Sequence, residues 1–358
     1  MNFKDILQRM IDNDASDIFI KTGSPLKGRV YSEIVTIDDG EFSAEDINNI
    51  VSEILDGSKR EILENDKSYD LAIDFSERWR FRTAIFCQSN TISLVIRKID
   101  LNILTFDELN LPVATLENIC TERQGLILLT GITGSGKSTT IAAMINFIAQ
   151  RMGRHIITIE EPIEFIFKSD KSIINQRELG RDVYSYPDAL RDFTLHSPDI
   201  IVIGNIRDQD TCKAALTAAE TGVLVFSTMH TIDAASTAER IINFFPAQQH
   251  KAVSNQLSTL LKCVMSQKLL PRNDTRGLIP AYEIMTLSPT ISGLIRENKL
   301  HEIPDYITAG QVHGMKSFNQ CLVELIKSKK ISERLALEHS NNKQELALKL
   351  RIQGFSRI

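Results

Sequence analysis

The chain has 358 residues, of which 42% are hydrophobic and 24% are charged, and its formal net charge is −5. This length predicts two domains, or one domain with a large appendage, and the apolar content is too high for a disordered chain. The sequence lacks an apolar run of roughly 18 to 20 residues and a signal peptide at its start, so we expect a cytoplasmic protein. The mild acidity argues against a protein that coats nucleic acid.

The cysteines are dispersed along the chain, form no CxxC pair and are odd in number. They are Cys87, Cys120, Cys212, Cys263 and Cys321. This pattern predicts reduced thiols rather than a disulfide framework. The histidines are scattered as well, and since structural zinc needs clustered ligands, no zinc site is expected.

The first hundred residues predict a small α/β domain. Apolar residues recur at helical spacing over 3–11, a short strand follows at 17–21, and Ser43 to Asp46 form a helix-start capping box. Three strand-like runs then follow closely, at 70–75, 80–86 and 91–97. Their closeness indicates an antiparallel meander.

The pattern changes after residue 125, beyond a connector at 99–111. Short apolar runs now alternate with helical stretches, at 126–129, 156–159, 200–203 and 223–226. This rhythm predicts a parallel sheet with crossover helices. The last seventy or so residues have a helical pattern that Gly314 interrupts.

A phosphate-binding loop follows the first of these runs. Residues 131–138 read GITGSGKS, which matches G-x-x-x-x-G-K-[ST] between a buried strand and a helix. Its glycines would let backbone N–H groups point at phosphate oxygens, Lys137 would reach the β- and γ-phosphates, and the Ser138 hydroxyl would bind Mg²⁺. The predicted nucleotide-binding residues are Gly131, Thr133, Gly134, Ser135, Gly136, Lys137, Ser138 and Thr139.

Polar residues follow the other buried runs, and ligands of an open parallel sheet lie at these strand ends. Glu160 follows 156–159 and is the candidate to polarise an attacking water, while Glu161 is a weaker candidate for a magnesium site. His230 follows 223–226 and could sense the γ-phosphate. A solvated acidic turn and a structural histidine are the alternatives.

Asn205 follows 200–203, where a nucleotide site usually has an acid. A neutral amide can accept a hydrogen bond from a metal-bound water, but it brings no negative charge and cannot take a proton. Asp208 lies three residues further on and could help. Asn205 is therefore hard to reconcile with fast hydrolysis.

Together these segments resemble the type II/IV secretion ATPase superfamily, and within it the type IV pilus retraction ATPases of the PilT and PilU kind. The matching stretches are GITGSGKSTT at 131–140, TIEEPIEF at 158–165, INQRELGRD at 174–182, DIIVIGNIRD at 199–208, ALTAAETG at 215–222 and STMHT at 227–231. ASDIFIKTGSP at 15–25 and GMKSFNQCL at 314–322 extend the resemblance over nearly the whole chain. The absence of a four-cysteine cluster favours the retraction type over the assembly type.

The resemblance implies an α/β fold in which a small N-terminal PAS-like α/β domain precedes a RecA-like P-loop ATPase domain with a helical C-terminal region. We expect the boundaries at 1–98, 99–111 for the linker, 112–285 for the ATPase core and 286–358 for the C-terminal region. It further implies ATP and Mg²⁺ as cofactors, Glu160 as general base, and Arg82 and Arg97 as arginines that reach the nucleotide when the domains close.

The resemblance also implies a homo-hexamer that drives pilus retraction and twitching motility. The expected partners are an inner-membrane pilus platform protein, through which the cytoplasmic ring lies at the inner face of the membrane, and possible active paralogue ATPases. No nucleic acid is expected as a partner. A nucleic-acid translocase on the same core is a third reading, against which the acidic balance weighs.

Three departures from the family pattern favour a second interpretation. Asn205 replaces the Walker B glutamate, Leu195 to Ser197 replace an expected arginine, glutamate and aspartate, and 290–296 reads TISGLIR where the retraction branch reads AIR-x-LIR. The chain could thus be an ATP-binding subunit that hydrolyses slowly and assists an active paralogue. Asn205 could also be an engineered substitution that traps a nucleotide state.

Overall fold

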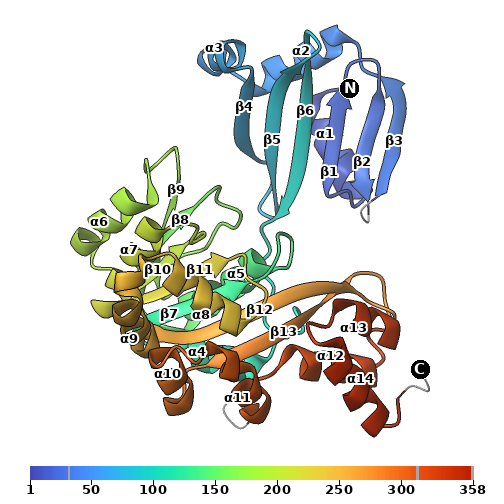
Figure 1. Ribbon diagram of the computed structural model, residues 1–358. Helices are drawn as coiled ribbons and strands as arrows, with labels where there is room; N and C mark the ends of the chain where they lie inside the picture. Colours follow the sequence, from blue (N-terminus) through green and yellow to red (C-terminus); the bar gives the residue numbers. More distant parts are fainter. Residues whose placement is uncertain (31–32, 312–313, 356–358) are drawn as a thin grey trace. The chain divides into compact units, whose positions relative to one another are not determined.

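A computed structural model describes residues 1–30, 33–311 and 314–355 (Figure 1). The chain divides into two compact units, Met1–Asn102 and Ile103–Ile358. The division falls inside the segment 99–111 that the sequence predicts as a connector. Phe106 and Leu111 of this segment are buried in the core of the second unit, so the later half of the connector packs as part of that unit.

The first unit contains a six-stranded sheet in the order β3-β2-β1-β6-β5-β4, with every neighbouring pair antiparallel. The strands are β1 (Asp17–Lys21), β2 (Pro25–Val30), β3 (Glu33–Glu41), β4 (Ser68–Asp74), β5 (Trp79–Gln88) and β6 (Thr91–Asp100). The predicted meander is confirmed by β4, β5 and β6. Sequence patterning missed β2 and β3, and β3 is an edge strand with no buried residue to mark it.

Three helices accompany this sheet, α1 (Phe3–Asp12), α2 (Ala44–Ile54) and α3 (Gly57–Asp66). The predicted capping box is confirmed, because the Ser43 side chain accepts from the Asp46 N–H and the Asp46 carboxylate accepts from the Ser43 N–H. Apolar residues of α1 and α2 share one core with alternate residues of the strands, such as Ile18 and Ile20 of β1. The helices therefore cover one face of the sheet.

The second unit contains a seven-stranded sheet in the order β13-β12-β7-β11-β10-β8-β9. The strands are β7 (Gly125–Thr130), β8 (His155–Glu160), β9 (Ile173–Glu178), β10 (Ile200–Ile203), β11 (Leu224–Met229), β12 (Leu261–Pro271) and β13 (Leu278–Thr286). Every neighbouring pair is parallel except β12 with β13. The structure confirms the predicted parallel arrangement and adds a hairpin, β12–β13, that the sequence did not reveal.

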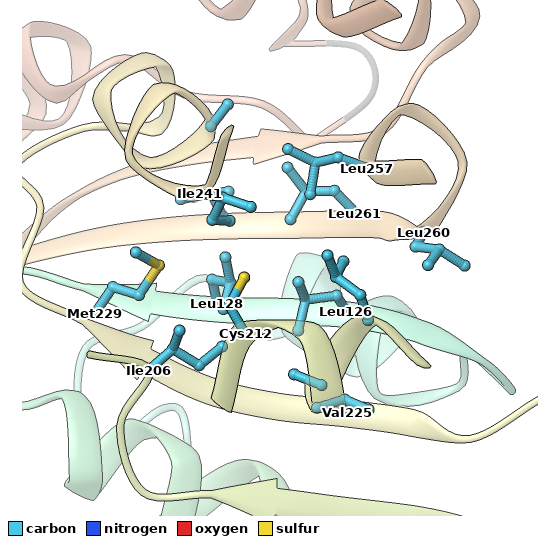
Figure 2. Packing of buried hydrophobic residues seen from close by; sticks show 14 of the residues in the cluster. Leu126, Leu128, Ile206, Cys212, Val225, Met229, Ile241, Leu257, Leu260 and Leu261 are labelled. Atoms are coloured by element: carbon cyan, nitrogen blue, oxygen red, sulfur yellow. The ribbon is translucent and has the colours of Figure 1, made fainter. Parts of the chain in front are cut away.

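Helices pack on both faces of this sheet. Strand β7 shows the division, since Leu126 and Leu128 enter one core and Ile127 and Leu129 enter the other. The first core, drawn in Figure 2, receives residues from α7 (Gln209–Glu220), α8 (Ala234–Asn243), α9 (His250–Leu260), α10 (Pro289–Arg296) and α11 (Ile303–Ala309). The second receives residues from α4 (Val113–Cys120), α5 (Lys137–Arg151), α12 (Phe318–Lys327), α13 (Glu333–His339) and α14 (Lys343–Ile352). Helix α6 (Tyr186–His196) precedes β10, and short 3-10 turns occur at Ala247–Gln249 and Leu300–Glu302.

The parallel register brings four strand ends to one edge of the sheet. Ile203 of β10 pairs with Ile159 of β8 and with Ser227 of β11, and Ser227 in turn pairs with Leu128 of β7. The segments that follow these residues therefore start at the same edge. They carry the phosphate loop, Glu160, Asn205 and His230.

Candidate nucleotide site

The phosphate loop joins the end of β7 to the start of α5. Gly131, Gly134 and Gly136 have φ angles of 138°, 77° and 90°, a region that only glycine enters readily. Gly131 also lies against β12, since a Cβ atom there would come within 2.4 Å of the Gln267 carbonyl oxygen. The strand, loop and helix thus stand in the order that a phosphate site requires.

Lys137, the first residue of α5, folds back over the loop. Its Nζ donates to the Gly131 and Ile132 carbonyl oxygens, at 2.8 Å each. Burial lowers the pKa of Lys137, and the charge of Glu164 acts in the opposite direction. The ammonium is therefore held at the loop by acceptors that phosphate oxygens can replace.

Strand β12 holds the two ends of the loop through two buried hydrogen bonds. The Thr140 hydroxyl of α5 donates to Gln267 Oε1 at 3.0 Å, and the hydroxyls of Thr130 and Ser266 lie 2.7 Å apart. Ser266 and Gln267 point to opposite faces of the strand. Ser266 contacts Thr130, which precedes the loop, and Gln267 contacts Thr140, which follows it. Sequence reasoning missed both, because it did not identify the strand that carries them.

The other predicted loop residues differ in exposure. Ser135 is buried, and within the described part of the chain its Oγ has no hydrogen-bond partner. Thr133, Gly134 and Ser138 are exposed and Thr139 is partly exposed. The hydroxyls of Ser138 and Thr139 therefore remain accessible in the first turn of α5.

Glu160 ends β8 and is held by two side-chain donors. Thr158 Oγ1 donates to Glu160 Oε1 at 2.6 Å, and Gln176 Nε2 donates to the same oxygen at 3.2 Å. Burial raises the pKa of Glu160, although these hydrogen bonds oppose the shift. The carboxyl group is therefore oriented and desolvated, as a proton acceptor in a hydrolytic site should be.

Glu161 has a different environment from Glu160. It is exposed, and its Oε2 lies 3.4 Å from Arg207 Nη1. Tyr186 of α6 also lies at this edge of the sheet, because a Cβ atom on Gly204 would come within 2.9 Å of the Tyr186 hydroxyl oxygen. Burial raises the pKa of Tyr186 to about 12, so the hydroxyl stays protonated. Sequence reasoning missed Tyr186, which no motif marks.

Asn205 follows β10 and is buried, with 7% of its surface exposed. Its backbone neighbours are fixed, since Gly204 N donates to Ile159 O and Ile206 N donates to Thr228 O. Within the described residues, however, Asn205 Oδ1 has no hydrogen-bond partner. An unpaired buried oxygen is costly, so this site is suited to a ligand that supplies a donor.

Asp208, the acid three residues after Asn205, has a structural role. It is the N-cap of α7, and its Oδ1 accepts from the Thr211 N–H at 2.8 Å. This carboxylate satisfies a helix end. It is therefore engaged as a cap and is a poor substitute for the acid that Asn205 replaces.

His230 ends β11 beside the phosphate loop. Burial lowers the pKa of His230, the charges of Lys137 and Arg207 lower it further, and a hydrogen bond with the Gly131 backbone opposes them. A cavity of about 460 Å³ lies next to His230 and is lined on other sides by Arg207 and Arg240. A neutral imidazole thus lies among cations at the strand edge.

Arg82 and Arg97 lie in the first unit and face each other across β5 and β6 as register partners. Arg82 Nη2 donates to Asp70 Oδ2 at 2.9 Å, and Arg97 Nε donates to Asp17 Oδ1 at 2.8 Å. Each guanidinium has a carboxylate partner within its own unit. The two predicted arginines thus lie side by side on neighbouring strands of the first unit.

The residues at the strand edge fit a nucleotide with Mg²⁺. The loop presents N–H groups at a helix N-terminus, which favours phosphate. Ser135 Oγ and Asn205 Oδ1 are the buried oxygens without partners among the described residues of this edge. The Ser138 hydroxyl and, through a water, the Asn205 amide oxygen are the groups that would hold the metal.

A protein-family model described as "Type II/IV secretion system protein" matches residues 2–283. The chain belongs to this family. The match covers the first unit from residue 2 onward and the whole strand edge of the second.

Relatives and solved structures agree with this assignment. The "Twitching motility protein" of Neisseria gonorrhoeae is 39% identical over 319 residues, which are 89% of this chain and 85% of the relative. The "Type IV pilus ATPase PilU" of Pseudomonas aeruginosa is 34% identical, over 98% of this chain and 92% of the relative. A crystal structure of the pilus retraction motor PilT with bound ADP is 39% identical, with a TM-score of 0.89 over 97% of this chain and 99% of that chain.

These similarities confirm the predicted fold class, a small N-terminal α/β domain followed by a RecA-like ATPase domain. They also confirm the resemblance to pilus retraction ATPases. Among the described residues, no helix is both long enough and apolar enough to cross a membrane.

Proposed function

We propose that this protein is an ATPase that powers type IV pilus retraction and twitching motility. The observation that carries the proposal is the phosphate loop with Lys137 folded over it, in a chain of the type II/IV secretion family. The relatives named as pilus ATPases and as a retraction motor support the choice of ATP and of the pilus.

Binding follows from the loop geometry. The phosphates of ATP replace the Gly131 and Ile132 carbonyl oxygens around Lys137 Nζ, and the N-terminus of α5 adds a favourable partial charge. The Ser138 hydroxyl and Asn205 would hold Mg²⁺, with Glu161 as a weaker candidate. When bound, the metal neutralises phosphate charge.

Hydrolysis follows from the acid that is already oriented. Glu160 takes a proton from the attacking water, because its carboxyl group is buried and held by Thr158. His230 senses the γ-phosphate in this proposal, which its hydrogen bond with the Gly131 backbone supports. Arg82 and Arg97 stabilise the developing negative charge when the N-terminal domain closes on the nucleotide.

The force-generating assembly is a homo-hexamer in this proposal. Opening and closing of each subunit between its two domains drives the pilus base. The ring acts at the inner face of the cytoplasmic membrane by docking on a pilus platform protein, and an active paralogue ATPase can join it. A nucleic-acid partner is not part of this proposal.

Asn205 favours a second candidate function. An ATP-binding subunit with little hydrolysis would keep the phosphate loop and lose the acid that helps to hold the metal. Such a subunit would assist an active paralogue of the same motor. Asn205 Oδ1, which has no hydrogen-bond partner among the described residues, fits a site that binds a ligand without supplying charge.

Steady-state ATP hydrolysis of the parent chain and of Asn205→Glu separates the two candidates. Equal and substantial rates support the motor and exclude a degraded site, whereas activity in Asn205→Glu alone makes Asn205 the cause of an inactive parent. If neither protein hydrolyses ATP, the other departures from the family pattern, at 195–197 and 290–296, also contribute to the loss of activity. Glu160→Gln in the more active background is the control for Glu160-dependent hydrolysis, and a nucleotide-bound particle that stays monomeric at all concentrations contradicts the motor.

A further inference from the structure

Gln176 lies on β9, the edge strand beside β8, and sequence reasoning gave it no task. Its register partner on β8 is Thr158, two residues before Glu160. Residues two apart on a strand point to the same face, so Thr158, Glu160 and Gln176 share one side of the sheet. This places the Gln176 amide next to the proposed base.

The Gln176 amide makes hydrogen bonds to three different groups. Its Nε2 donates to Glu160 Oε1 at 3.2 Å and to the Phe165 carbonyl oxygen at 2.7 Å, while its Oε1 accepts from the Phe167 N–H at 3.0 Å. One side chain therefore joins the proposed base to the loop that follows it. Both N–H donors of the amide and one acceptor position are in use.

The direction of the Glu160 bonds matters for catalysis. Thr158 and Gln176 both donate to Oε1, and the Glu164 backbone also donates to this carboxylate. A carboxylate held by several donors keeps one orientation, and such orientation contributes to rate. Burial raises the pKa of Glu160, and the bond from Gln176 opposes this shift.

We propose that Gln176 is a positioning residue for hydrolysis, which fixes the Glu160 carboxylate and holds residues 161–167 against β9. This inference rests on the proposed role of Glu160 as the base. It differs from a purely structural role, because it requires kcat to fall in a folded protein whose affinity for ATP is unchanged. Asn175, the preceding residue of β9, points to the other face and bonds His155 instead, which makes it a matched control.

The test compares Gln176→Glu, Gln176→Met and Asn175→Leu with an otherwise identical protein, either the parent chain or Asn205→Glu, whichever hydrolyses ATP faster. Gln176→Glu retains an acceptor for the Phe167 N–H and loses the donor to Glu160, whereas Gln176→Met loses both. We expect kcat to fall at least about tenfold in both Gln176 variants and to stay within about twofold in Asn175→Leu. KM for ATP should change less than about twofold, because the amide does not touch the nucleotide.

Hydrogen–deuterium exchange of residues 161–167 provides a readout that needs no ATP hydrolysis. Faster exchange of this segment in Gln176→Met, with no change in Asn175→Leu, supports the proposed hold on the loop. A kcat within about twofold of the background in a folded Gln176→Met protein overturns the inference, and so does unchanged exchange in this variant where neither background hydrolyses ATP. Absence of hydrolysis in both backgrounds overturns only the proposed function, because the exchange result does not depend on it. Circular dichroism checks the fold.

Discussion

Glu283 of β13 and Ala234 at the start of α8 are joined by a buried hydrogen bond, in which the Ala234 N–H donates to Glu283 Oε1 at 3.0 Å. Helix α8 begins four residues after His230, so this bond ties the His230 turn to the sheet. Glu283 is opposite Ser266, and Ser266 is opposite Thr130. A row of polar residues thus crosses the sheet from the phosphate loop to α8.

The first prediction concerns the ionisation of Glu283. Burial raises its pKa to about 7, the charge of Asp233 also raises it, and the Ala234 and Phe318 backbones and Lys268 oppose the shift. The folded state therefore holds a proton that the unfolded state releases between about pH 4.5 and 7. The free energy of unfolding should fall by up to about 3 kcal/mol as pH rises through this window, because the ionised carboxylate is disfavoured in the folded state.

Glu283→Gln should remove this pH dependence, since its amide oxygen can still accept the Ala234 N–H and carries no charge. Chemical denaturation at about pH 5 and pH 8 measures the difference. Glu239→Gln, an exposed change on α8, is the control, and its stability should depend on pH as that of the parent does. A parent stability that rises from pH 5 to pH 8, in a manner that Glu283→Gln abolishes, would show that Glu283 is stabilised as a carboxylate.

The second prediction concerns the support beneath the phosphate loop. Thr140→Val keeps the shape of the side chain but leaves Gln267 Oε1 buried without its donor. We expect a loss of about 1–3 kcal/mol in the free energy of unfolding, the usual cost of an unsatisfied buried group. Urea denaturation followed by circular dichroism measures this loss. Thr217→Val on the exposed side of α7 should cost less, and equal losses in the two variants would mean that the Gln267 bond contributes nothing special.

The phosphate loop could be predicted because one short segment contains both the chemistry and its structural context. Gly131 to Ser138 supply the residues, and a strand and a helix flank them. The support from β12 could not be predicted, because this strand is buried on both faces and carries Ser266 and Gln267 inside. Such a strand shows no alternation of apolar and polar residues, which is the pattern that reveals a half-buried strand.

The sequence ranks Glu160 above Glu161 but does not reveal their different surroundings. Glu160 ends β8 and Glu161 follows it directly, and the packing distinguishes them, since Glu160 is held by Thr158 and Gln176 whereas Glu161 pairs with exposed Arg207. The partners of the two glutamates come from segments up to 46 residues away in the chain, the separation of Glu161 and Arg207. Contacts over such separations have no local sequence signal.

The third prediction concerns Lys137. Lys137→Ala removes the ammonium that lies over the loop, and charge-assisted hydrogen bonds to phosphate are lost with it. We expect affinity for ATP and ADP to fall at least about tenfold, the equivalent of one such bond. Isothermal titration calorimetry measures it, with exposed Lys213→Ala as the control. Unchanged affinity in a folded Lys137→Ala protein would contradict the proposed binding mode.

The fourth prediction separates the two arginines that share Asp17. Arg97 Nε lies 2.8 Å and Arg29 Nε lies 3.5 Å from this carboxylate, which is 6% exposed. Removing either arginine removes one of the two ion pairs of Asp17, but only Arg97 is proposed to reach the nucleotide. We therefore expect Arg97→Gln to lower kcat at least about tenfold, as loss of a charge-stabilising arginine does, while Arg29→Gln keeps kcat within about twofold. Steady-state ATP hydrolysis, in the parent chain or in Asn205→Glu according to which is active, measures both, and thermal denaturation confirms that the variants are equally folded. Equal losses of kcat in the two variants would assign the effect to the Asp17 ion pairs and contradict a role for Arg97 at the phosphates.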